Sequence, residues 1–181
     1  MKILIFTEGT ILTNKRWIGL PREEIVKQVK RWSSLSKEEL KKLQKSGAAP
    51  SPEYFAGSVP IGNCASKIKT WKIQGATIIY LTSRRKSEEV EIIKDVLRRY
   101  NFSTGELFFR QKGEEYKDVA ERVLPNIIVE DDCASIGGEE EMTHPHIRPA
   151  LRSKIKSVVV KEFGGIDHLP DNIEELMRCH S

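Results

Sequence analysis

Carboxylates follow short apolar runs at two distant points of the sequence. Glu8 comes after the first apolar run of the chain, and the triplet Glu130, Asp131 and Asp132 comes after a run that ends at Val129. Carboxylates gathered in one place repel one another unless a cation lies among them, and Mg²⁺ prefers ligand sets made only of oxygen. We therefore expect a Mg²⁺ site formed by Glu8, Glu130, Asp131 and Asp132.

Hydroxyl groups follow a third apolar run and suit the recognition of a phosphate group. Thr82 and Ser83 stand at the end of this run and can donate hydrogen bonds to phosphate oxygens. A lysine, either Lys117 or Lys112, can neutralise the remaining charge, and glycine at position 9 lets the backbone approach a ligand closely. The expected partner is a small phosphorylated ligand, and the expected phosphate-binding residues are Gly9, Thr10, Thr82, Ser83 and Lys117.

Strand and helix patterns alternate along most of the chain. Apolar, β-branched runs predict five strands, and apolar residues at helical spacing predict the helices between them. This alternation implies right-handed crossovers and a three-layer, Rossmann-like α/β fold, with helices on both faces of a mostly parallel five-stranded sheet. Ligands bind at the carboxyl ends of such strands. The strands are expected over residues 2–6, 76–82, 107–109, 127–129 and 157–160, and the helices over 60–74, 86–100 and 114–124, with a short one after Pro170.

The segment between the first two core strands has a different character. An amphipathic helix follows Pro21, and a capping box formed by Ser36 and Glu39 begins a second helix, which ends at the Gly- and Pro-containing stretch 47–52. The predicted division is a core of residues 1–12 and 58–181 and a small α-helical cap insertion of residues 13–57.

Each candidate residue also has a purely structural interpretation. Thr82 and Ser83 suit caps of the helix that follows them, because capping and phosphate binding use the same backbone geometry. The acidic triplet suits a solvated turn that ends a strand, and Lys117 suits an ordinary surface lysine at the start of a helix.

The composition is that of an ordinary globular protein. Hydrophobic residues make up 39% of the chain and charged residues 31%, and the net charge of +4 suits anionic ligands without indicating nucleic acid as a partner. No apolar run is long enough to cross a bilayer, the chain opens without a signal-peptide pattern, and its three cysteines form no Cys-x-x-Cys pair. We expect a cytoplasmic protein with no membrane partner. A basic rim of Arg84, Arg85 and Arg110 leaves an RNA-associated role as a weaker alternative, since no aromatic stacking platform accompanies it.

The order of these segments resembles the haloacid dehalogenase-like (HAD-like) hydrolase superfamily. That family's first motif, a strand ending in Asp-x-Asp-Gly-Thr, matches residues 6–10, and its second, a strand ending in Ser or Thr, matches residues 78–84. The lysine of its third motif matches Lys117, and its acidic fourth motif matches residues 127–132. The resemblance covers the first strand and residues 58–132. It implies a Rossmann-like core, a Mg²⁺ cofactor and phosphohydrolase chemistry in which Glu8 and Lys117 are the catalytic residues.

The first motif departs from the family pattern at the residue that does the chemistry. In the family the first aspartate attacks phosphorus, and the second acts as general acid and base. Phe6 occupies the first position and cannot attack, accept a proton or bind Mg²⁺, whereas Glu8 in the second position keeps the acid–base function. Two functions therefore remain open. One is a phosphohydrolase that uses metal-activated water without an aspartyl-phosphate intermediate. The other is a catalytically inactive protein that binds a phosphorylated metabolite or a partner protein.

Overall fold

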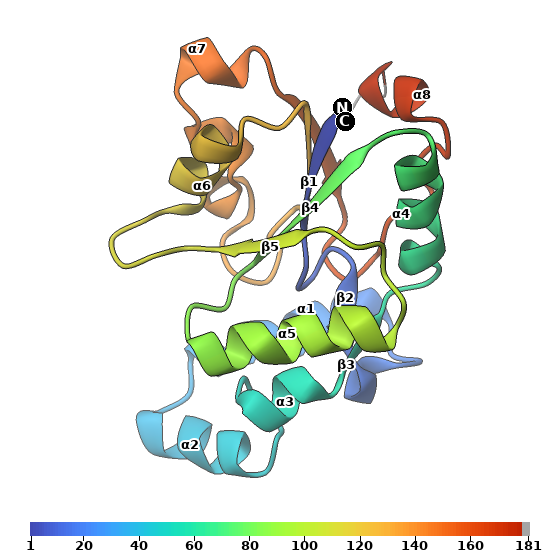
Figure 1. The fold of residues 1–181 in the computed structure, drawn as a ribbon. Coiled ribbons are helices and arrows are strands. Elements are labelled where there is room, and N and C mark those ends of the chain that lie inside the picture. Colours follow the sequence, from blue (N-terminus) through green and yellow to red (C-terminus); the bar gives the residue numbers. More distant parts are fainter. Residues whose placement is uncertain (179–181) are drawn as a thin grey trace.

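Five parallel strands form the central sheet of the computed structural model, which describes residues 1–178 (Figure 1). The strand order is β5-β4-β1-β6-β7, and each neighbouring pair is parallel. The predicted Rossmann-like α/β fold is therefore confirmed. The last three residues of the predicted core range, Cys179 among them, lie outside the described part. The strands are β1 (Lys2–Phe6), β4 (Thr77–Thr82), β5 (Glu106–Phe109), β6 (Ile127–Asp131) and β7 (Lys156–Val160).

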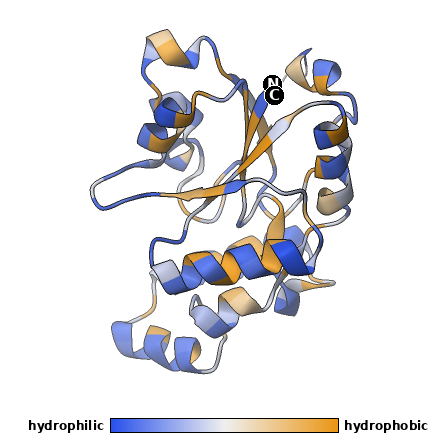
Figure 2. Cartoon of the chain, viewed as in Figure 1, coloured by the Kyte–Doolittle hydropathy of each residue, from blue (hydrophilic) through white to orange (hydrophobic). Residues whose placement is uncertain are grey.

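Helices follow the strands and pack against both faces of the sheet. In α5, Val90, Ile93, Val96 and Leu97 recur at helical spacing and are buried, and Figure 2 shows this helix striped orange and blue. Single 3-10 turns at Gly138–Glu141 and His144–His146 lie between β6 and β7. The core helices are α4 (Cys64–Ile73), α5 (Ser87–Arg99), α6 (Tyr116–Val123), α7 (Pro149–Arg152) and α8 (Ile173–Arg178).

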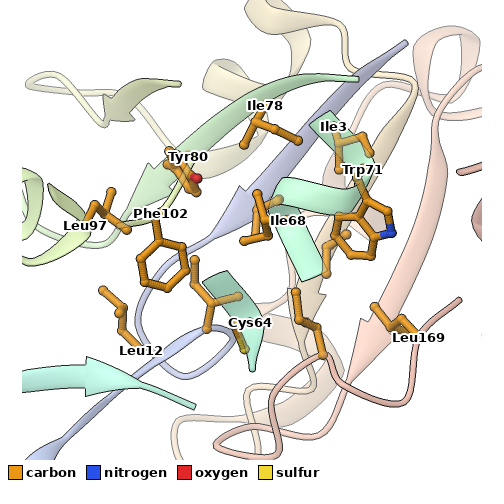
Figure 3. Close-up of a cluster of buried hydrophobic side chains, with 14 of the residues drawn as sticks. Ile3, Leu12, Cys64, Ile68, Trp71, Ile78, Tyr80, Leu97, Phe102 and Leu169 are labelled. Carbon is orange, nitrogen blue, oxygen red and sulfur yellow. The ribbon is translucent and has the colours of Figure 1, made fainter. Parts of the chain in front are cut away.

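The two faces of the sheet carry separate hydrophobic cores, because successive side chains of a strand point to opposite faces. Ile3 and Ile5 belong to the larger core, which includes residues of α4, α5 and α8, whereas Leu4 belongs to the smaller core beneath α6. Figure 3 shows Trp71 of α4 close to Ile3 in the larger core. The sheet is thus fixed from both sides, and its carboxyl edge has a rigid support.

The strand order changes direction at β1. The chain adds β4 and β5 on one side of β1 and then returns to place β6 and β7 on the other. The register pairs Phe6 with Leu81 and Ile5 with Val129, so the carboxyl ends of β1, β4 and β6 lie side by side. Open α/β sheets bind ligands outside the carboxyl ends of their strands at such a point.

A short antiparallel pair closes the insertion at its base. Strand β2 (Leu12–Asn14) pairs with β3 (Ser58–Pro60), and the sequence patterns did not predict this pair. Because β3 takes residues 58–60, helix α4 begins at Cys64, four residues later than predicted. The insertion holds the 3-10 turn Lys15–Trp17 and the helices α1 (Arg22–Ser33), α2 (Lys37–Lys45) and α3 (Pro52–Ala56).

The helices of the insertion follow the local sequence signals. The capping box is confirmed, because Ser36 Oγ accepts from the Glu39 N–H and the Glu39 carboxylate accepts from the Ser36 N–H. Helix α2 buries no residue, and it is largely blue in Figure 2. Helix α3 lies against α5 at the lower end of the molecule in Figure 1, which anchors the insertion to the core. Among residues 1–178, no helix has the length and apolar character needed to cross a membrane.

Candidate functional site

A cavity of about 580 Å³ opens between the carboxyl ends of the strands and the insertion. Phe6, Glu8 and Ser83 line it from the sheet edge, and Trp32 and Tyr54 line it from the insertion. Since the lining comes from segments far apart in the sequence, the crossovers of the fold are what create this space.

Glu8 lines the cavity, and donors engage both of its carboxylate oxygens. Oε1 accepts from Thr82 Oγ1 at 2.6 Å, and Arg84 Nε lies 3.5 Å from the same oxygen. Oε2 accepts from Thr7 Oγ1 at 2.7 Å and from the backbone N–H of Ser83 at 3.0 Å. The structure thus brings Glu8, Thr82 and Ser83 together, and the carboxylate occupies the donors that the sequence assigned to phosphate.

Thr82 and Ser83 do not cap the helix that follows them. Helix α5 begins at Ser87 with Lys86 in the N-cap position, and no side chain caps it. The fully buried Thr82 hydroxyl instead donates to Glu8 and accepts from the Arg84 N–H at 3.1 Å. The hydroxyl and amide at the end of β4 are therefore directed at an anionic group.

Three carboxylates gather at the ends of β6 and β7. Oxygens of Asp131, Asp132 and Glu162 lie within 4.8 Å of one another, and these residues could hold a metal ion. The pKa of Asp131 is raised to about 7, chiefly by burial; the hydrogen bond from Thr10 opposes this rise, and repulsion from Glu162 adds to it. Burial also raises the pKa of Glu162. A cation at this cluster would offset the cost of burying charged carboxylates and would reduce the repulsion between them.

Each carboxylate of this cluster is held by a different part of the chain. The Thr10 hydroxyl donates to Asp131 Oδ2 at 2.8 Å, and the Ser135 hydroxyl donates to Glu162 Oε1 at 2.6 Å. Asp132 accepts from Arg22 Nη2 of helix α1 at 2.9 and 3.1 Å. Thr10 therefore orients an acid, whereas the sequence assigned it to phosphate.

Gly9 adopts a left-handed conformation directly beside the acidic cluster. Its φ is +83°, and a Cβ atom here would lie 2.8 Å from Asp131 Oδ2. Gly9 also lines the cavity, so the expected close approach of a ligand to its backbone stays a prediction. The space that a side chain would fill here is taken by the Asp131 carboxylate.

Glu130 and Glu8 lie outside the three-carboxylate cluster found in the described part of the chain, although both were expected to share the metal. The Glu130 carboxylate accepts from the backbone N–H groups of Thr143 at 2.7 Å and His144 at 3.0 Å. Its side chain is almost completely buried, and burial raises its pKa. Alternation along β6 explains the difference, because neighbouring residues of a strand point to opposite faces.

Lys117 lies outside the lining of the cavity. It ion-pairs with Glu115 at 2.7 Å on helix α6, and 37% of its side chain is exposed. The cations in the cavity wall come instead from Arg84 and Arg110, which the sequence analysis had placed only in a basic rim. Position at the start of a helix was too weak a signal to identify a cation that lines the cavity.

Arg110 is a desolvated cation without a carboxylate partner among residues 1–178. Its guanidinium lies 3.7 Å from the centroid of the Tyr116 ring, its Nη2 donates to Tyr116 Oη at 3.1 Å, and its Nε is buried without a hydrogen-bond partner. Burial lowers the pKa of Arg110, and Arg85 and Arg84 lower it further by repulsion. Arg110 as a whole is only partly buried, but its Nε is shielded from water without an acceptor. An unsatisfied buried donor on a cation is costly, so this wall of the cavity favours an anion.

Phe6, at the end of β1, has no side-chain group that could attack a substrate, transfer a proton or bind a metal ion. Its ring meets the ring of Tyr116 edge-on, with centroids 5.3 Å apart. The cavity therefore combines an apolar floor, a cationic wall and an acidic cluster, an arrangement that can bind an anion together with a metal ion. No protein-family model matches the sequence, and a search of curated proteins finds no match either.

Proposed function

We propose that this chain binds a small phosphorylated molecule together with Mg²⁺ in the cavity at the carboxyl edge of the sheet. The observation that carries the proposal is Arg110, a partly buried cation in the cavity wall whose Nε has no acceptor and which lacks a carboxylate partner within the described residues. A phosphate group supplies the missing negative charge and accepts the donors of a guanidinium well.

Mg²⁺ suits the proposal because the acidic cluster offers only oxygen ligands. Asp131, Asp132 and Glu162 carry more negative charge than Arg22 alone balances. Mg²⁺ commonly binds one or two carboxylates and completes its coordination with water and substrate phosphate. The ligand would thus contact the arginines on one wall and share the cation with the acids on the other.

Between binding and hydrolysis, the geometry favours binding. Phe6 stands where the HAD-like family has its nucleophile, and both oxygens of Glu8 are engaged by donors. The HAD-like assignment itself is part of the proposal. It is supported by the order of the four segments along the chain and by the strand order with β1 at its centre. Hydrolysis by metal-activated water is the second candidate, and it rests on the closeness of Glu8 to Thr82 and Ser83.

Calorimetric titration with inorganic phosphate and Mg²⁺, added singly and together, tests the proposal. We expect each to tighten the binding of the other, because opposite charges on adjacent ligands attract. Absence of phosphate binding in the presence of saturating Mg²⁺ would overturn it. A screen of phosphate monoesters for phosphate release then separates hydrolysis from binding.

A matched pair of variants locates the binding site. Arg110→Met and Lys117→Met remove the same charge, but only Arg110 lines the cavity. We expect Arg110→Met to weaken phosphate binding by about tenfold or more, and Lys117→Met to leave it nearly unchanged. Equal losses in the two variants would show that the contribution is only the net charge of the protein.

A further inference from the structure

The Glu8 carboxylate lies where an oxyanion would be bound. Two donors from the end of β4 converge on it: the Thr82 hydroxyl at 2.6 Å from Oε1, and the Ser83 backbone N–H at 3.0 Å from Oε2. Arg84 adds a positive charge 3.5 Å from Oε1. Charge-assisted hydrogen bonds of this kind bind carboxylate and phosphate oxygens alike.

We propose that Glu8 is an internal competitor of the ligand: its carboxylate fills the phosphate subsite formed by Thr82, Ser83 and Arg84, and a phosphate group enters only when the Glu8 side chain leaves. This inference rests on the proposed function, since it concerns the same cavity. It adds that the Glu8 side chain lowers the affinity of the cavity for phosphate, because the Glu8 carboxylate and the phosphate group compete for the same donors.

The burial of the donors explains why the subsite needs an anion at all times. Thr82 is fully buried, and its hydroxyl would lose its acceptor if Glu8 moved away without a replacement. An unsatisfied buried donor is costly. Glu8 satisfies it in the free protein, and an arriving phosphate satisfies it in the complex, so the exchange keeps the Thr82 hydroxyl paired. The buried Thr7 hydroxyl, which also donates to Glu8, has the Leu81 carbonyl oxygen at 3.3 Å as a second acceptor.

The position of Glu8 also makes the exchange sterically feasible. Its side chain keeps 23% of its surface exposed and lines the cavity together with Ser83 and Arg84, whereas Thr82 is fully buried. The Glu8 backbone precedes Gly9, so the segment is held by the turn and not by the carboxylate alone. The side chain can therefore rotate into the cavity without unfolding the sheet edge.

Calorimetric titration of the full chain with inorganic phosphate, with Mg²⁺ present throughout, tests the inference. We compare the wild type with Glu8→Ala, with the double variant Glu8→Ala/Thr82→Val, and with Glu88→Ala. Glu88 is an exposed residue of α5, and its removal produces the same change in net charge. Glu8→Gln serves as a milder variant that keeps the side-chain size, and thermal unfolding verifies that each protein is folded.

We expect Glu8→Ala to bind phosphate at least about tenfold tighter than both the wild type and Glu88→Ala, with Glu8→Gln in between. The double variant, which lacks the Thr82 hydroxyl, should lose this gain in affinity. In NMR spectra of Glu8→Ala, the resonance of the Ser83 backbone amide should shift when phosphate binds. Phosphate binding by the wild type that is equal or tighter than by Glu8→Ala overturns the inference and leaves the proposed function standing. Absence of binding in every variant overturns the proposed function, and the inference with it.

Discussion

The guanidinium of Arg110 lies 3.7 Å from the centroid of the Tyr116 ring and donates a hydrogen bond to its hydroxyl oxygen. This contact positions the cation in the cavity wall but supplies no negative charge. Burial raises the pKa of Tyr116, so the phenol stays neutral beside the arginine at ordinary pH. Arg110 is thus held against Tyr116 with its charge unbalanced by any carboxylate of the described residues.

Replacement of Arg110 should separate stability from binding. We expect Arg110→Met to be as stable as the wild type within about 1 kcal/mol, because the removal of a partly buried, unpaired cation offsets the loss of its contacts with Tyr116 and the apolar stem is retained. Urea unfolding measures the free energy. Arg85→Met, at an exposed position nearby, should change it by less than about 0.5 kcal/mol. A marked loss of stability in Arg110→Met would show that the arginine is structural.

Alanine at position 9 should destabilise the protein through two separate effects. Gly9 has a φ of +83°, and a Cβ atom there would lie 2.8 Å from Asp131 Oδ2. Gly19 has nearly the same φ, +82°, with nothing within 4 Å of its Cβ position. Gly19→Ala should therefore lose about 1 kcal/mol for the conformation alone, and Gly9→Ala at least about 1 kcal/mol more. Equal losses in urea unfolding would contradict the crowding by Asp131.

Asp131 should make the free energy of unfolding fall between about pH 4 and pH 7 when metal ions are removed with a chelator. Its pKa is raised to about 7 by burial first, so the folded state binds a proton that the unfolded state has already released. Stability is therefore greatest while the acid is protonated and declines as the pH rises through this window. Asp131→Asn mimics the protonated acid and should flatten the decline. Unfolding curves measured across the pH range for both proteins check this, and parallel profiles would contradict it.

Phe6→Asp tests the resemblance to the HAD-like superfamily. If Phe6 occupies the nucleophile position, an aspartate there should produce Mg²⁺-dependent phosphate release from a generic phosphate monoester. Phe6→Asn has the same size without the charge and should release none. Both variants lose the edge-on contact with Tyr116, so both should be less stable than the wild type by similar amounts. Absence of activity in a folded Phe6→Asp protein would argue against the alignment of the first motif.

The sheet could be predicted because its strands carry strong local signals. The β-branched run that became β4 and the apolar run that became β6 are bounded by turn residues and helices, and both lie within two residues of their predicted bounds. The pair β2–β3 could not be predicted in this way. Each strand has three residues, and Pro60 belongs to the second. Strands this short carry no recognisable sequence pattern, and they form because the segments that flank them bring the two stretches together.

The candidate site could be predicted only at the level of segments. The ends of β1, β4 and β6 meet, but the direction of each side chain depends on strand alternation and on tertiary neighbours. Glu130 therefore supports the Thr143 loop, while Asp131 joins the cluster. Glu162 was not identified because a single acid after a strand carries no motif, and its membership depends on β7 lying beside β6. Lys117 shows the reverse case, a motif position whose side chain pairs on the surface.

The ion pair between Arg22 and Asp132 ties the insertion to the sheet edge across 110 residues of chain. Asp132 thereby contacts the first helix of the insertion and also belongs to the group of acids that could hold a cation. A substitution that removes the charge of Arg22 would leave the Asp132 carboxylate, next to the end of β6, without its ion-pair partner. The charges of the insertion and of the sheet edge are therefore coupled. We expect the effect of a mutation at Arg22 to depend on which residue stands at position 132, and the reverse.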